Sequence, residues 1–111
     1  MLARASVNGV DGRFIIDTGA SYVSLTEGFA RKTGVDLANA PVVQTLTANG
    51  LTDRKLTTAE VIQIGPIKAR LVSVAVGGNL GDEIDGLLGM SFLARFSVTL
   101  TPGRLEISAH K

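Results

Sequence analysis

The chain has 111 residues, 45% of them hydrophobic and 19% charged, and its formal net charge is +1. This length and composition indicate one folded domain over residues 1–111 and exclude a largely disordered chain, while the balanced charge argues against a nucleic-acid partner. Cysteine is absent, which excludes disulfides and a cysteine nucleophile, and the single histidine, His110, lies beside the C-terminus, where it cannot be the centre of a Ser-His-Asp triad.

The first part of the chain predicts a hairpin followed by a helix. Residues 2–7 and 13–16 are short apolar runs on either side of an Asn-Gly turn at 8–9, which predicts two antiparallel strands. Residues 24–34 predict a helix, because Thr26 can cap its N-terminus and a glycine stands at its end.

The middle of the chain predicts a long hairpin. Residues 41–47 and 51–64 flank the dipeptide Asn49-Gly50, whose tolerance of positive φ suits a two-residue turn. A Gly-Pro turn then leads into a further apolar run at 67–76. We therefore expect three consecutive antiparallel strands in this region.

The last part of the chain predicts a polar loop, a short helix and a final hairpin. The loop opens with glycines at 77–78, and the apolar run at 84–88 resumes the core. Residues 90–94 fit a short helix, while 96–101 and 104–108 flank a Pro-Gly turn. Glycines at such short intervals are typical of an all-β chain.

A carboxylate stands where an apolar strand ends. Residues 14–16 run directly into the sequence Asp-Thr-Gly-Ala-Ser at 17–21. These are ordinary turn formers, so an isolated Asp-Thr-Gly is most often a turn with a capping aspartate. The context here is more specific, because the sequence Asp-Gly-Leu-Leu-Gly-Met follows much later in the chain, at 85–90.

With these two segments, the chain resembles the retropepsin-like aspartic proteases, in particular the bacterial single-domain type, over nearly its whole length. The resemblance implies an all-β fold, namely a closed and mostly antiparallel barrel with one or two short helices. It identifies Asp17 as the catalytic aspartate and Thr18 as the threonine that ties the two catalytic loops together across a dimer. Gly19 corresponds to the glycine that lets the loop backbone come close.

The resemblance also implies a set of substrate contacts. Asn49, Gly50 and Leu51 resemble the tip of the flap that closes over the substrate, although only Gly50 remains of the glycine run found there in retroviral members. Leu87 belongs to the segment of two hydrophobic residues and a glycine that passes behind the catalytic loop. Ala20 follows the retroviral pattern, in which alanine replaces a hydroxyl that would donate to the aspartate.

The expected activity is that of an aspartic endopeptidase that hydrolyses extended polypeptides. In such enzymes one ionised and one protonated carboxylate share a water molecule, because two like charges at close range cannot both ionise. One chain has a single Asp-Thr-Gly, so a symmetric homodimer with Asp17 from each subunit is expected. The expected partners are therefore a polypeptide substrate and a second copy of the chain.

Two other functions compete with this interpretation. A non-catalytic retropepsin-like module could use the same dimer and groove to bind an extended peptide as an added strand. A phosphoryl-transfer enzyme with Asp17 as the nucleophile is disfavoured, because the loop has no second acidic residue and no basic phosphate clamp is evident.

No cofactor or metal is expected. Asp82, Glu83 and Asp85 lack the spacing of a calcium loop, and Asp85 is better suited to ordering the turn before Leu87. The longest apolar runs are far shorter than the roughly 20 residues that span a bilayer. A membrane is therefore expected as a partner only if an anchor lies outside this chain, which would then be the periplasmic part of an anchored bacterial protein.

Overall fold

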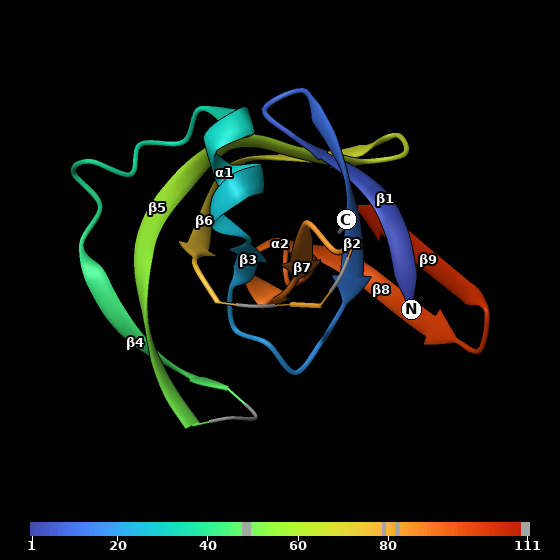
Figure 1. Ribbon diagram of the computed structural model, residues 1–111. Coiled ribbons are helices and arrows are strands. Elements are labelled where there is room, and N and C mark those ends of the chain that lie inside the picture. The colour runs from blue at the N-terminus through green and yellow to red at the C-terminus, as the bar shows by residue number, and fades with distance from the viewer. Residues whose placement is uncertain (48–49, 79, 82, 110–111) are drawn as a thin grey trace.

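The computed structural model describes residues 1–47, 50–78, 80–81 and 83–109. Within these residues the strands are β1 (Leu2–Val7), β2 (Val10–Ile16), β3 (Val23–Leu25), β4 (Val42–Thr47), β5 (Gly50–Ile64), β6 (Ile67–Val76), β7 (Gly86–Leu88), β8 (Phe96–Thr101) and β9 (Arg104–Ala109). The two helices of this part of the chain are α1 (Glu27–Thr33) and α2 (Met90–Leu93) (Figure 1). Neither of these described helices is long and apolar enough to cross a membrane.

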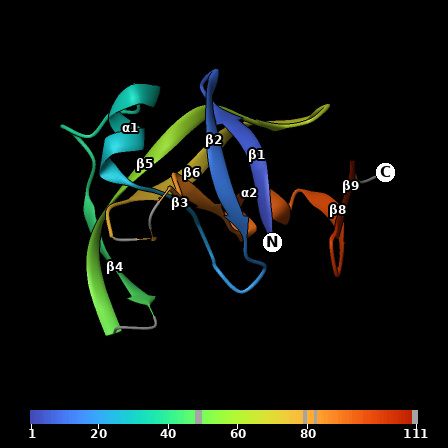
Figure 2. The same ribbon diagram turned by 45° about the vertical axis from the view of Figure 1, so that its right-hand side comes forward.

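In the described part of the chain, six strands close into a ring. Their order is β1, β2, β7, β3, β6 and β5, and β5 pairs again with β1 at Ser6–Gln63 and Val7–Ile62. Strand β4 extends the sheet beyond β5, and β8 and β9 form a separate hairpin on the opposite side of the molecule (Figure 2). Only the β2–β7 and β3–β6 pairs of the described strands are parallel. The expected closed, mostly antiparallel barrel with short helices is therefore confirmed.

The core fills the ring because strand residues alternate between its inside and outside. In β2, Phe14 and Ile16 are buried, whereas Arg13 between Gly12 and Phe14 is exposed. The Phe14 ring meets the Phe29 ring of α1 edge-on, with centroids 5.7 Å apart, so α1 closes one end of the barrel. Burying each of these rings stabilises the fold by roughly 1.5–3 kcal/mol.

Helix α1 has the two caps that its sequence predicts. The Thr26 hydroxyl accepts a hydrogen bond from the Phe29 backbone N–H at 3.3 Å, and Gly34 ends the helix with φ +76°. The predicted start at Ser24 is wrong, because residues 23–25 form strand β3 between β6 and β7. Three residues are too few to show an alternating pattern, and both partners of this strand lie far away in the sequence.

The turn chemistry of the first hairpin also follows the sequence. Asn8 and Gly9 both adopt positive φ, +51° and +84°, which matches the twist of the flanking strands. The corresponding dipeptide of the β4–β5 hairpin includes Asn49, which lies outside the described residues. The pairing of β4 with β5 nevertheless runs from Val42–Lys55 to Thr47–Gly50, as a long hairpin requires.

Candidate active site

Asp17 lies at the end of β2, where the strand leaves the barrel. Its backbone N–H donates to the Leu88 carbonyl of the parallel strand β7 at 3.1 Å, which fixes where the loop begins. The Gly19 backbone N–H donates to Asp17 Oδ1 at 2.9 Å, and the Asp17 carbonyl accepts from the Ala20 N–H at 3.3 Å. A Cβ at position 19 would stand 3.2 Å from that same Oδ1, so glycine leaves the half-buried carboxylate open.

The other end of this loop is anchored to α2. The Met90 and Ser91 backbone N–H groups donate to the carbonyls of Ala20 and Ser21 at 2.7 and 2.9 Å. The Ser91 hydroxyl accepts from the Val23 N–H at 2.9 Å and donates to the Ser73 carbonyl of β6 at 2.7 Å. The loop that carries Asp17 is therefore hydrogen-bonded to β7 and to α2, and Ser91 in turn joins α2 to β3 and β6.

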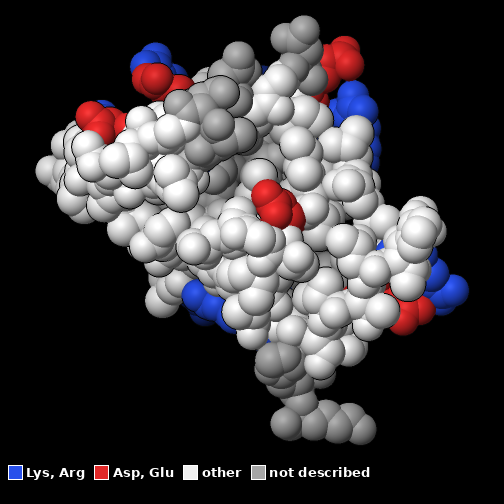
Figure 3. All heavy atoms as spheres, turned by 90° about the horizontal axis from the view of Figure 1, so that it is seen from below, with Lys and Arg blue, Asp and Glu red and all other residues white. Residues whose placement is uncertain are grey.

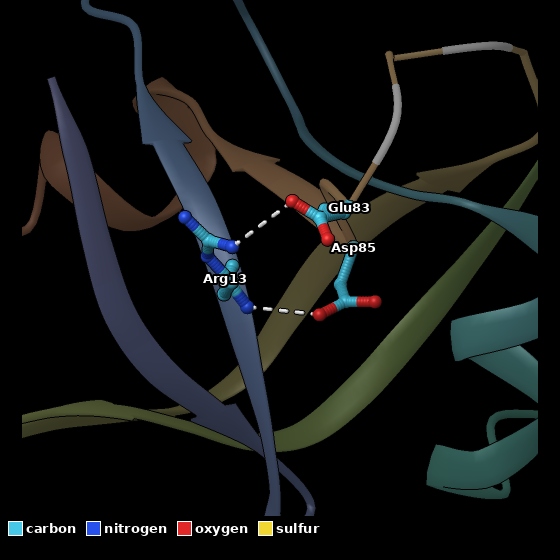
Figure 4. A network of polar contacts seen from close by, with 3 residues as sticks. All are labelled: Arg13, Glu83 and Asp85. Carbon is cyan, nitrogen blue, oxygen red and sulfur yellow. Dashed lines mark hydrogen bonds and ion pairs between the residues drawn. The ribbon is translucent and has the colours of Figure 1, made fainter.

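The segment just before β7 is joined to β2 by hydrogen bonds between Asp85 and Arg13, which are among the residues drawn in Figure 4. One Asp85 carboxylate oxygen accepts from the Arg13 backbone N–H at 2.9 Å. The Asp85 backbone N–H also donates to the Arg13 carbonyl at 2.9 Å. The Arg13 guanidinium forms an exposed ion pair with Glu83 at 3.6 Å. Asp85 thus fixes the backbone at the start of β7, two residues before Leu87. Across the described residues, no three acidic or histidine side chains stand close enough to hold a metal ion.

Beside Asp17 is a pocket of about 950 Å³. It is lined by the loop after β2, by Gln44, Thr45 and Leu46 of β4, by Thr52 and Arg54 of β5, by Ser24 of β3 and by Leu87 of β7. Asp17 is the only acidic residue among the described lining residues. The view from below shows a hollowed, mostly uncharged face with an acidic group near its middle (Figure 3).

The residues that the sequence singles out are only partly brought together in one chain. Asp17, Gly19, Ala20 and Leu87 line the pocket. Thr18 is exposed and lies outside this lining. Gly50 and Leu51 are the first two residues of β5 in the β4–β5 hairpin, and they also lie outside the pocket lining. Leu51 is 67% exposed. Asn49 lies outside the described residues.

Sequence reasoning missed Arg54, the most heavily buried charged residue of the described chain. It is 8% exposed, and its Nη1 donates to the Ser24 hydroxyl at 2.6 Å. Burial lowers the pKa of the Arg54 guanidinium from its ordinary value. One sequence feature could have predicted that Arg54 is buried. Successive strand residues alternate between the two faces, and Arg54 stands two residues from Thr52 and two from Leu56, so it lies on their inward-facing side of β5.

Two curated relatives match most of the chain in sequence. A protein found in the cobV 5′ region of Sinorhizobium sp, described as uncharacterised, is 41% identical over 91 residues, which are 81% of this chain and 39% of that protein. An uncharacterised protein of Rickettsia prowazekii (strain Madrid E) is 40% identical over 93 residues, 83% of this chain and 39% of its own length. The chain thus spans about two fifths of these curated relatives.

A solved structure and a family model are more informative. The crystal structure of a retropepsin-like aspartic protease from Rickettsia conorii matches with a TM-score of 0.77 at 34% identity, covering 96% of this chain and 80% of that one. The family model of the gag-polyprotein putative aspartyl proteases matches residues 3–95. On this evidence, the chain belongs to the gag-polyprotein putative aspartyl protease family and has a retropepsin-like fold.

Proposed function

We propose that this chain is an aspartic endopeptidase that acts as a homodimer. The observation that supports this most directly is the Asp17 carboxylate, which the Asp-Thr-Gly loop holds at the wall of a pocket large enough for several peptide residues. Family membership supports the reaction type. The chain spans about two fifths of its curated relatives, and the proposal concerns residues 1–111.

The need for a second copy follows from the chemistry. Attack of water on a peptide carbonyl requires a base for the water proton and an acid for the carbonyl oxygen. Asp17 supplies one carboxylate, and the described lining of the pocket holds no other. A two-fold axis beside Asp17 would bring in the same residue from a partner, and the exposed Thr18 would face the partner's loop.

Hydrolysis in this dimer proceeds by proton transfers between the two Asp17 carboxylates, the water molecule and the peptide. The ionised Asp17 takes a proton from water as the water oxygen adds to the scissile carbonyl carbon, and the protonated Asp17 gives its proton to the carbonyl oxygen. The C–N bond of the tetrahedral diol then breaks as the departing nitrogen takes a proton from one Asp17, while one hydroxyl of the diol gives its proton to the other Asp17 and becomes the carbonyl of the product. The dyad is thereby left with one proton, as at the start. The Gly19 N–H, which already donates to Oδ1, holds the carboxylate in one orientation throughout.

The β4–β5 hairpin is suited to cover a bound peptide. Gln44, Thr45, Leu46 and Thr52 of this hairpin line the pocket opposite the Asp17 loop. The Thr45 hydroxyl is buried and makes no hydrogen bond to any described residue. A peptide backbone in the pocket could satisfy such a group, as buried polar atoms normally require.

The test is cleavage of a peptide library by the purified chain, read by mass spectrometry and terminal sequencing. We expect internal cuts that add one water to each product pair. A peptide with a hydroxyl-bearing tetrahedral carbon at the scissile position should block them, because it imitates the addition species. Tight binding of that peptide with no cleavage of any library member would favour a non-catalytic peptide-binding module.

A further inference from the structure

Arg54 is a buried cation in the wall of the candidate active site. It lies on the inward face of β5, is 8% exposed and lines the same pocket as Asp17. Arginine carries five N–H donors and stays protonated in proteins. To the described residues the guanidinium makes one hydrogen bond, from Nη1 to Ser24, and its buried Nε–H has no partner among them.

The charge of Arg54 is not balanced by a carboxylate in the described chain. The ion pairs among described residues join Glu83, Glu27, Glu60 and Glu106 to other arginines. A buried charge without a partner is costly, which is why buried arginines are normally paired. The position is therefore of the kind that a ligand of opposite charge completes.

The neighbouring carboxylates do not fill this role. A smaller pocket of about 430 Å³ on the other side of Arg54 is lined by Glu27 and Asp53. Glu27 is exposed and is held by Arg31 at 2.7 Å in an i,i+4 pair. Asp53, the neighbour of Arg54 on β5, is exposed to solvent and forms no ion pair with a described residue.

Gly78, just after β6, packs against this guanidinium. Gly78 has φ +82°, and a Cβ there would stand 2.7 Å from Arg54 Nη2. A larger residue would therefore displace the guanidinium or the loop. Because Gly78 and Arg54 both line the pocket, the glycine keeps the charged end of the arginine next to the space that a ligand would occupy.

We infer that Arg54 forms a subsite for a carboxylate of an extended peptide, so that the preferred substrates carry an acidic group at one fixed position relative to the scissile bond. The inference rests on the proposed function, because it places a peptide in the Asp17 pocket. A planar guanidinium matches a carboxylate with two parallel N–H donors. The carboxylate comes from an Asp or Glu side chain or from a peptide C-terminus.

The experiment uses pairs of peptides that differ only by Glu or Gln at one position, scanned along a sequence that the wild type cleaves. A second set compares a free C-terminal acid with its amide. We expect one position, or the free terminus, at which the acid raises kcat/KM by about tenfold to a hundredfold, the usual effect of a hydrogen-bonded charge. The side-chain and terminal sets distinguish the two sources of the carboxylate.

Protein variants assign the preference to Arg54. Arg54→Gln should remove the preference for the acid peptide over its amide counterpart. Arg54→Lys should keep part of this preference, because the positive charge remains while the two-donor geometry is lost. Lys68→Gln, which removes the same charge from an exposed residue outside both pockets, should leave it unchanged. Equal use of acid and amide peptides by the wild type, or an acid preference that survives in a folded Arg54→Gln variant, would overturn the inference.

Binding to the Asp17→Asn variant separates this inference from the proposed function. Acid-selective binding without any cleavage by the wild type would contradict the peptidase and support the Arg54 subsite. Cleavage without any acid preference would contradict the subsite and leave the peptidase standing. If Arg54→Gln fails to fold, the peptide pairs on the wild type and on Arg54→Lys still decide, since the wild type is unaltered and lysine keeps the positive charge.

Discussion

Asp17→Asn should abolish peptide cleavage while the fold is retained. The amide has nearly the same shape, and its oxygen can still accept the Gly19 N–H that Oδ1 accepts at 2.9 Å. It can neither take a proton from water nor return one to the leaving nitrogen. Since a positioned acid–base group contributes about 10² to 10⁴ in rate and the homodimer loses both of its carboxylates, we expect kcat to fall by about ten-thousandfold or more.

The control for this substitution is Asp11→Asn, which makes the same chemical change at an exposed carboxylate of β2 outside the pocket. It should retain wild-type kcat/KM. Circular dichroism and the Tm of both variants should match the wild type. Wild-type cleavage by Asp17→Asn would show that Asp17 only caps its turn.

Gly89→Ala should destabilise the fold strongly. A Cβ at this position would stand 2.2 Å from the Tyr22 carbonyl oxygen and 2.8 Å from that of Ala20, both of them backbone atoms. Neither can move without disturbing the loop between Asp17 and β3. We expect the free energy of unfolding to fall by about 3 kcal/mol, at the upper end of the usual range for overpacking, together with a loss of activity.

The matched control is Gly28→Ala on the exposed face of α1, where a Cβ would meet nothing within 4 Å. Gly28 is the second residue of the helix, where alanine lowers the conformational entropy of the unfolded chain without a clash, so this variant should have wild-type stability or slightly more. Urea unfolding measures both. A Gly89→Ala protein with wild-type stability would mean that the contact between Gly89 and the Tyr22 carbonyl is not as close as described.

Much of the fold is encoded in local sequence. The Asn8-Gly9 turn, the Thr26 cap and the Gly34 end of α1 act over a few residues, and each is found where the sequence predicts it. Strand β3 is different, because Val23–Leu25 is defined only by its pairing with β6 and β7. No local pattern can predict an element whose partners are about 50 or more residues away.

The residues of the candidate site also differ in whether the local sequence predicts them. The Asp-Thr-Gly sequence predicts Asp17 as a site residue, because the identity of these three residues is enough to recognise the motif. The residue types around Arg54 give no such signal, since Asp53 and Lys55 on either side suggest a solvated charged run. Only the alternation of the strand, which places Arg54 on the same face as Thr52 and Leu56, points to its burial. Its burial depends on the register of β5 against β4 and β6 and on the loop at Gly78, which are long-range properties.

One active site should need Asp17 from two chains, and mixing wild type with Asp17→Asn tests this most directly. The chains are mixed in varying ratio, given time to exchange subunits, and assayed with substrate in large excess, while sedimentation confirms the dimer. If both carboxylates are required, an equal amount of the variant should lower the activity per wild-type chain to about half, and a large excess should abolish it. Activity per wild-type chain that stays constant at every ratio would contradict the shared site.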